Sequence, residues 1–374
     1  MLDHSAALSR AGAAERKRWR ANRLAYTKER TAALEDAADD WRFSEDERRV
    51  RERRRREFAE QRATAALDRA SRALHRRRIV ARCEDLPPIG AGTVQLVFFP
   101  DDDGWWVFAA DADGVDVAWT DSLTAWSIPD TLAHRLIGAE LVRVVPTGEA
   151  WRLVIPSLVV GDQSLLDQAP IVHALDLEQR TQGSIKHAVV VADPTEDLAH
   201  ARLEATGVAT ALRDSGWTVD ALEGREATRD AVVASLANAS VLHYAGHGRY
   251  RGDAGWESAL VLHDGQALTV QDVLLLATVP SSVVLTGCET GATNADMLAG
   301  GMSLGRAFVL AGASSLVVAN TNVDDRLAQQ IGEALYANAG SENWTLATEL
   351  RRVQLRLRRS RPKSDWASFR VIVP

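Results

Sequence analysis

Two stretches, VLHYAGHG at residues 241–248 and SSVVLTGCETG at residues 281–291, decide the fold class of this chain. In each, a short apolar strand ends in a small residue and is followed by a chemically reactive side chain, His247 in the first and Cys288 in the second. Functional residues of open α/β sheets lie beyond the carboxyl ends of the strands. If these strands are parallel neighbours, His247 and Cys288 project from the same edge of the sheet.

An imidazole beside a thiol is the minimum unit of an activated cysteine nucleophile. His247 is expected to take the thiol proton of Cys288 as a general base and to return it to a leaving amine as a general acid. The flanking glycines let the backbone approach a substrate closely. The backbone N–H groups of Gly248 and Cys288 are the predicted oxyanion hole. The alternative for a single cysteine is a buried structural thiol.

The rest of residues 186–374 predicts alternating strands and helices. Strands are expected at 187–192, 218–222, 241–245, 259–262, 283–286, 315–319 and 369–373, and helices at 197–214, 226–238, 269–277, 303–311, 324–338 and 345–359. Such alternation is typical of a largely parallel sheet with helices on both faces. The predicted fold class is therefore α/β, and residues 181–374 are expected to form its catalytic part.

Residues 86–180 are predicted to be a β-rich extension of this sheet. A linker with two prolines and two glycines, LPPIGAG at 86–92, precedes a three-stranded meander at 93–99, 105–110 and 115–119. Clusters of aspartate and glycine mark its turns. A helix near 121–138 and strands near 141–145 and 151–155 are expected to follow.

Residues 1–85 predict an α-helical hairpin, with helices over roughly 5–37 and 45–81. Ser44 with Glu47 three residues later is a capping-box pattern that starts the second helix. The segment has 23 basic and 16 acidic residues, a net charge of +7, whereas the remainder has 21 and 35, a net charge of −14. Its apolar stripe is sparse, so the hairpin is expected to dock either on the body of the protein or on another protein. We interpret it as a regulatory segment that an activating protein binds.

Composition excludes several classes of protein. Only two cysteines are present, Cys83 and Cys288, which excludes a disulfide framework and a cysteine-rich zinc site. No apolar run is long enough for a membrane span, and the first 30 residues lack a signal core. The net charge of −7 argues against a dedicated nucleic-acid binder. We therefore expect a cytoplasmic protein that needs no cofactor and no metal.

Several separate blocks of the chain resemble the CHAT family of caspase-like cysteine peptidases. They are VLHYAGHG, SALVLHDGQALTVQDVLLL, SSVVLTGCETG, GGMSLGRAFVLAGASSLVVANTNVDD and the closing WASFRVIVP, in the order of the family. The resemblance covers about residues 86–374. It implies a caspase-like fold, an endopeptidase that cuts a protein partner, and His247 and Cys288 as the catalytic dyad. It also implies a bacterial setting in antiviral defence or regulated cell death.

The chain departs from that family in one respect. Long helical repeats commonly precede the domain in CHAT proteins, whereas only about 80 helical residues precede it here, without a 34-residue period. Either the short hairpin takes over their regulatory role, or the sequence is part of a longer protein. The alternative to a peptidase is a catalytically silent caspase-like scaffold that acts through protein binding.

Four acidic residues are candidates for substrate binding: Asp193, Glu289, Asp324 and Asp325. Asp193 follows the first parallel strand and either orients His247, lines a pocket, or caps the next helix. Asp324 and Asp325 either pair with a basic substrate side chain or cap the helix at 324–338. Glu289 adjoins Cys288 and either contacts the substrate or supports its loop. A basic residue before the cut is therefore the expected preference.

Overall fold

The computed structural model describes residues 89–101, 103–121, 127–175, 177, 185–250, 255, 257–292 and 302–374, and the isolated residues 14, 17, 21, 47 and 50. Residues 1–86 and 87–374 form two compact units. The five isolated residues, which all belong to the first unit, are helical. The rest of the predicted hairpin and its helix boundaries lie outside the described residues.

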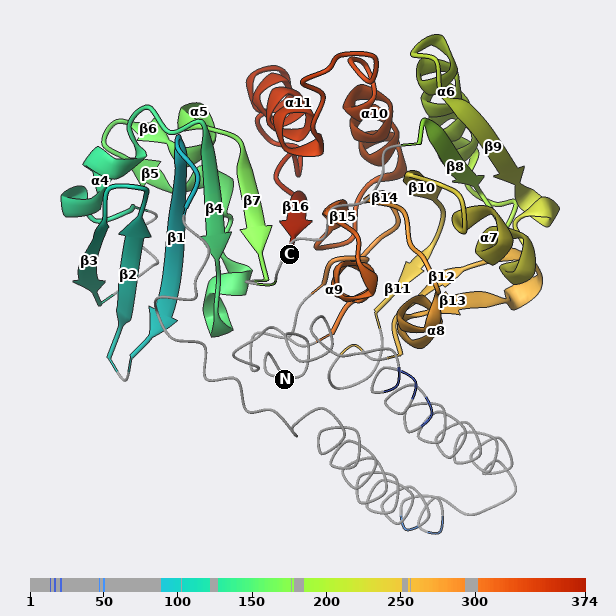
Figure 1. Cartoon of the computed structure of the whole chain (residues 1–374), viewed down its shortest axis with the longest axis horizontal. Coiled ribbons are helices and arrows are strands. Elements are labelled where there is room, and N and C mark those ends of the chain that lie inside the picture. The colour runs from blue at the N-terminus through green and yellow to red at the C-terminus, as the bar shows by residue number, and fades with distance from the viewer. Residues whose placement is uncertain are drawn as a thin grey trace. The chain divides into compact units, whose positions relative to one another are not determined.

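One sheet of eleven strands runs through residues 93–374 (Figure 1). Its strands in chain order are β1 (Thr93–Pro100), β2 (Trp105–Ala110), β3 (Val115–Thr120), β4 (Leu141–Val145), β7 (Ile171–Ala174), β8 (His187–Ala192), β9 (Thr218–Glu223), β10 (Val241–Ala245), β14 (Ser282–Leu285), β15 (Ser315–Ala319) and β16 (Phe369–Val373). Their spatial order is β3-β2-β1-β4-β7-β16-β15-β14-β10-β8-β9.

Most neighbouring strands of this sheet are parallel. Only the β1–β2, β2–β3 and β15–β16 pairs are antiparallel. The two halves of the sheet, which the sequence predicted as an extension and a catalytic part, are joined by the pairing of β7 with β16. The helices are α4 (Asp130–Leu136), α5 (Leu165–Gln168), α6 (Ala199–Asp214), α7 (Arg229–Leu236), α8 (Val270–Leu275), α9 (Leu304–Ala311), α10 (Asp325–Leu335) and α11 (Leu346–Ser360). The predicted α/β class is confirmed.

Three details of the predicted strands and helices are wrong. Residues 148–152 form a 3₁₀ helix where a strand was expected at 151–155, and β7, which was not predicted, supplies the next strand of the sheet. The strand at 259–262 is β12 (Ala259–Val261), which lies in a separate three-stranded sheet between β11 (Gly248–Arg249) and β13 (Ala267–Thr269). The helix expected near 121–138 is the shorter α4 within the described residues.

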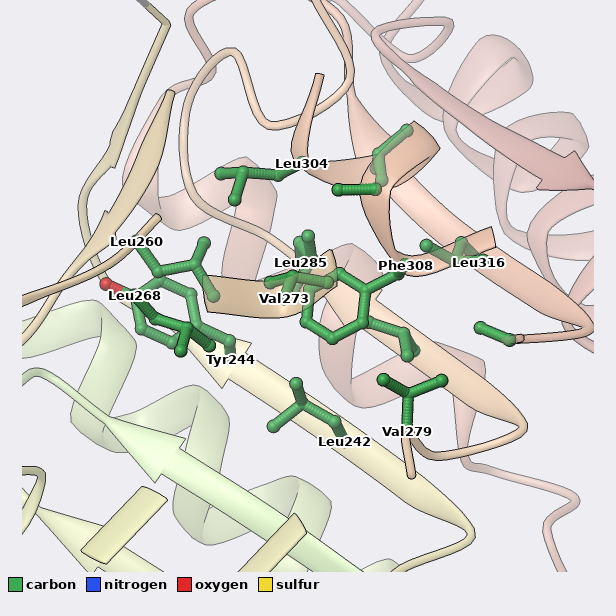
Figure 2. Packing of buried hydrophobic residues seen from close by; sticks show 14 of the residues in the cluster. Leu242, Tyr244, Leu260, Leu268, Val273, Val279, Leu285, Leu304, Phe308 and Leu316 are labelled. Atoms are coloured by element: carbon green, nitrogen blue, oxygen red, sulfur yellow. The ribbon is translucent and has the colours of Figure 1, made fainter. Parts of the chain in front are cut away.

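Apolar side chains on the two faces of the sheet form separate cores. On one face, Phe308 of α9 packs among Leu285, Leu316 and Val279 (Figure 2). On the opposite face, α6, α10 and α11 cover the strands. Burial on both faces explains why the central strands consist of almost unbroken apolar residues.

A polar triad is buried in the core beneath α6 and α10. His243 of β10, Glu204 of α6 and Tyr336 just after α10 are each almost fully buried. The His243 Nε2 atom lies 3.0 Å from Glu204 Oε1, and its Nδ1 atom lies 3.3 Å from the Tyr336 hydroxyl. Burial raises the pKa of Tyr336 well above its usual value. The His243–Glu204 contact is within ion-pair distance but lacks hydrogen-bond geometry, so these two buried atoms have no hydrogen-bond partner.

Trp151 packs at the seam where β7 meets β16. Its ring lies 4.4 Å from the guanidinium of Arg306 and 5.8 Å from that of Arg370, and His173 stacks on it at 6.3 Å between ring centroids. Burial lowers the pKa of Arg306 to about 9, and burial together with Arg306 lowers that of Arg370 to about 9. Both guanidiniums therefore stay charged at neutral pH and can make cation–π contacts with the indole.

Trp151→Ala is expected to lower the free energy of unfolding by about 3–5 kcal/mol, because it opens a cavity and removes the aromatic ring shared by two buried cations. Urea denaturation followed by circular dichroism measures this change. Trp119→Ala is the matched control, since that indole is 45% exposed, and its cost should be under about 1 kcal/mol. Equal costs for the two variants would show that Trp151 does not stabilise the seam.

Candidate active site

His247 and Cys288 lie just beyond two neighbouring parallel strands, β10 and β14. Tyr244 of β10 is directly opposite Leu285 of β14. His247 comes three residues after Tyr244, and Cys288 comes three residues after Leu285. The single hydroxyl proton of buried Tyr244 is shared between the carbonyl of Val261 at 2.6 Å and that of His247 at 3.0 Å. This phenol therefore fixes the backbone at which the His247 side chain leaves the sheet.

The loops after β10 and β14 are in backbone contact. A Cβ atom added to Gly248 would lie 2.3 Å from the carbonyl oxygen of Cys288, and one added to Gly287 would lie 2.4 Å from that of Gly246. Real Cβ contacts are not this short, so glycine is required at both positions. The structure thus brings the backbones that carry His247 and Cys288 together.

The imidazole of His247 is paired with a carboxylate that the sequence analysis did not single out. Its Nε2 atom lies 3.2 Å and 3.3 Å from the two carboxylate oxygens of Asp197. The His247 side chain is 44% exposed and that of Asp197 is 61% exposed. A hydrogen bond from the Thr195 hydroxyl, with a further contribution from His247, lowers the pKa of Asp197. Asp197 is therefore ionised at neutral pH and can orient the ring and stabilise its protonated form.

Asp193, which the sequence nominated, supports the turn that carries Asp197. Its carboxylate is fully buried and accepts hydrogen bonds from the backbone N–H groups of Asp197 at 3.1 Å and Leu198 at 3.0 Å. It also forms an ion pair with Arg202. Asp193 and Glu196 both have positive φ angles, 39° and 60°. Because of this tight turn, the carboxylate that contacts His247 is Asp197.

Cys288 is partly exposed and hydrogen-bonded to one residue of the neighbouring loop. Its thiol donates to the carbonyl of Val323 at 3.6 Å, and the N–H of Val323 donates to its sulfur at 3.4 Å. The following residue, Glu289, has a φ of 56°, a conformation uncommon for residues other than glycine. The buried Thr290 hydroxyl is within hydrogen-bond distance of the backbone carbonyls of Leu285 and Gly287. These contacts hold the turn that carries Cys288.

The backbone N–H of Gly248 points away from its neighbouring strand. In the β11–β12 pair, Val261 N–H bonds to His247 carbonyl oxygen at 2.9 Å, and the register places Gly248 opposite Leu260. Bonded and non-bonded pairs alternate in antiparallel strands, so the Gly248 pair is a non-bonded one. Its amide lies on the side of β11 that faces Gly287.

The remaining nominated residues adjoin Cys288 or its hydrogen-bond partner Val323 in the chain. Asp324 caps α10 by accepting a hydrogen bond from the N–H of Leu327 at 3.1 Å, and Asp325 is in the first turn of that helix. Both are exposed and follow Val323, the residue bonded to Cys288. Glu289 is half-buried beside the thiol. One carboxylate, Glu289, thus follows Cys288 in the chain, and two others, Asp324 and Asp325, follow the residue that is hydrogen-bonded to it.

Within the described parts of residues 87–374, no group of three or more histidine, cysteine, aspartate or glutamate side chains is arranged to hold a metal ion. None of the helices described is long and apolar enough to cross a membrane.

The family model described as the CHAT domain matches residues 120–374. None of the curated proteins matches the sequence. The matched region contains every nominated site residue, from Asp193 to Asp325.

Two kinds of solved structure are similar to the chain. The complex of separase and securin from Saccharomyces cerevisiae at 3.0 Å resolution has 14% identity and a TM-score of 0.47 over 63% of this chain and 16% of that chain. The complex of the pro- and mature domains of RgpB from Porphyromonas gingivalis has 12% identity and a TM-score of 0.45, over 63% of this chain and 64% of that one. The matched part is thus a small fraction of the separase chain and about two thirds of the RgpB chain.

Proposed function

The chain belongs to the CHAT domain family, and we propose that it is a cysteine endopeptidase that cleaves a protein partner, with Cys288 as nucleophile and His247 as general base and acid. The observation that carries this proposal is the placement of the two residues beyond adjacent parallel strands, on loops whose backbones touch through Gly248 and Gly287. A histidine and a thiol that only packed in the core would be buried, whereas both of these are partly exposed at a sheet edge.

In the proposed reaction the Cys288 sulfur attacks the scissile carbonyl carbon while His247 holds the thiol proton. The amides of Gly248 and Cys288 stabilise the oxyanion of the tetrahedral intermediate. When the carbon–nitrogen bond breaks, the imidazolium gives its proton to the leaving amine and an acyl-enzyme thioester remains. Water activated by His247 then releases the acid and regenerates the thiol. Asp197 stabilises the imidazolium in both steps.

A basic residue before the scissile bond is the proposed preference. Asp324 and Asp325 are exposed at the start of α10 and adjoin the backbone group that binds the Cys288 sulfur. A carboxylate pairs well with a lysine or arginine side chain. The partner would be cut in a regulated pathway, for which the family resemblance implies bacterial defence or cell death, and the basic segment 1–85 would bind the activating protein.

The proposal is tested by digesting a proteome-derived peptide library with the full chain and identifying new termini by mass spectrometry. A Cys83→Ser background leaves Cys288 as the only thiol, so iodoacetamide blocks that residue alone. Cuts that disappear after alkylation support the peptidase. Cuts that persist would exclude Cys288 as the nucleophile.

A catalytically silent scaffold is the second candidate, and one observation favours it. The Cys288 thiol is hydrogen-bonded to Val323, while the His247 ring is paired with Asp197. In a peptidase, this bond must exchange for one with the imidazole when substrate or an activator binds. If no peptide is cut and Cys288 reacts with iodoacetamide no faster than glutathione does, the scaffold is the correct assignment.

Asp197→Asn is expected to lower kcat roughly 10- to 100-fold and leave KM nearly unchanged, because the amide keeps the shape but no longer stabilises the imidazolium charge. The pKa of Asp197 is lowered, so protonation of this carboxylate adds no pH dependence to the loss in the neutral range. Glu196→Gln is the matched control, because Glu196 lies one residue away and its nearest cation is Arg225 at 3.8 Å. Equal kcat for wild type and Asp197→Asn would remove Asp197 from the mechanism.

A further inference from the structure

The outer face of the β1–β2–β3 meander is apolar and exposed. We call it the meander face and define it by Phe99, Trp106, Val115, Val117 and Trp119. These side chains are 40–62% exposed. They make up half of the large exposed apolar side chains in the described part of the chain.

The strand register makes these residues one continuous surface. Phe99 is directly opposite Trp106, which is directly opposite Trp119, so the three aromatic rings cross the meander in a row. Phe108 and Val117 form a second row beside it. Directly opposite residues share a face of a sheet. The other face of the meander is covered, because Val107 and Ala109 are fully buried with Leu132 and Leu136 of α4.

The size of the meander face is that of an interaction surface. An aromatic side chain presents about 200 Å², so the exposed fractions of the five residues correspond to roughly 450 Å² of apolar surface. The largest apolar patch on a typical soluble monomer covers about 300–600 Å² and is often functional. A stable protein–protein interface covers about 800 Å² on each partner, so this patch would be the apolar centre of such an interface.

Acidic residues at both ends of the face indicate the charge of the partner. Residues 93–121 contain seven aspartates and no lysine, arginine or histidine. Two of the aspartates, Asp111 and Asp116, pair with Arg135 of α4. Asp101, Asp103 and Asp121 are exposed at one end of the three strands, and Asp113 is exposed at the other. A second copy stacked on this face would set acidic turns against acidic turns. Anionic membranes and nucleic acids would be repelled for the same reason.

We propose that the meander face binds an amphipathic helix of another protein, whose apolar stripe covers the three aromatic rings and whose flanking lysines or arginines pair with the acidic turns. The face is remote from the candidate active site, because seven strand spacings of about 4.8 Å separate β3 from β14. A partner held there leaves the loops of His247 and Cys288 open. The proposal does not depend on the peptidase assignment.

Two fluorescent synthetic peptides of 18 residues test this chemistry on the full chain. Both have leucines at helical spacing on one side, and one has lysines on the flanks where the other has glutamates. Fluorescence anisotropy should show at least tenfold tighter binding of the lysine peptide, with an affinity that falls as salt rises. Equal affinities for the two peptides, or no binding by the lysine peptide, would overturn the proposal.

The double variant Val117→Thr, Trp119→Ser places the binding on this face. It should weaken lysine-peptide binding at least tenfold and leave the thermal midpoint nearly unchanged, because both side chains are exposed and threonine keeps the β propensity. Leu203→Ser, which removes a side chain 55% exposed on α6, should bind as wild type does. Undiminished binding by the double variant would overturn the proposal. So would a dimer of the wild type in sedimentation that this variant dissociates, because the occupant would then be a second copy.

Discussion

Replacing Cys288 with alanine is expected to abolish peptide cleavage and leave the fold intact. Removing the nucleophile of a covalent mechanism lowers kcat by roughly 10⁴-fold or more, which is below detection in a peptide digest. The thiol is only partly buried and bonds to a single residue, Val323. Loss of these weak sulfur bonds should change the free energy of unfolding by about 1 kcal/mol or less.

The measurement compares new peptide termini generated by wild type, Cys288→Ala and Cys83→Ala under the same conditions. Cys83→Ala controls for the loss of a thiol as such and should cut as wild type does. Thermal denaturation of all three proteins checks that the fold is preserved. If Cys288→Ala produces the same cuts as wild type, another residue or a contaminating enzyme is responsible, and the proposed function fails.

The sequence predicted the strands on either side of the candidate site because their signal is local. A four- or five-residue run such as β10 or β14, mostly apolar and with glycine within two residues of its end, is too short for a helix and favours a buried strand. The placement of His247 and Cys288 beyond the same edge of the sheet followed from the parallel order of those strands. The structure confirms that order.

Asp197 could not be predicted in the same way. Asp193 was a candidate to orient His247 because it directly follows β8, but Asp193 and Glu196 adopt positive φ angles that bring Asp197 toward the imidazole. Residues other than glycine seldom adopt such angles, and the local sequence does not predict them. The only available signal was a second carboxylate within the same turn, which a helix cap would explain equally well.

The two errors in strand prediction, β7 missed and a strand wrongly placed at 151–155, have the same cause. In both places the local conformation depends on contacts with residues far away in the chain. Trp151 looked like a strand residue because it is aromatic and is followed by Leu153, Val154 and Ile155. Its place is set by two guanidiniums from α9 and β16, which are far away in the chain. The β7 strand is only four residues long and forms because β4 and β16 pair with it on either side.

Gly248→Ala is expected to reduce kcat/KM at least about 100-fold while the chain still folds. The new methyl group would lie 2.3 Å from the carbonyl oxygen of Cys288 and 2.8 Å from Cγ2 of Thr290, and Thr290 is held by two backbone hydrogen bonds. The loop that carries His247 must therefore move away from the thiol. A displacement of about 1 Å between reacting groups costs on the order of 100-fold in rate.

The matched control for this variant is Gly340→Ala, where the added Cβ would meet Ser215 at an ordinary 3.5 Å. That variant should keep wild-type kcat/KM, and thermal denaturation of both should show cooperative unfolding. The alkylation rate of Cys288 in Gly248→Ala separates two causes of lost activity. A fall in that rate toward the rate of free glutathione indicates that the imidazole has left the thiol, which is the expected result. If Gly248→Ala cleaves at more than half the wild-type rate, the contact between the two loops is not what positions His247 against Cys288.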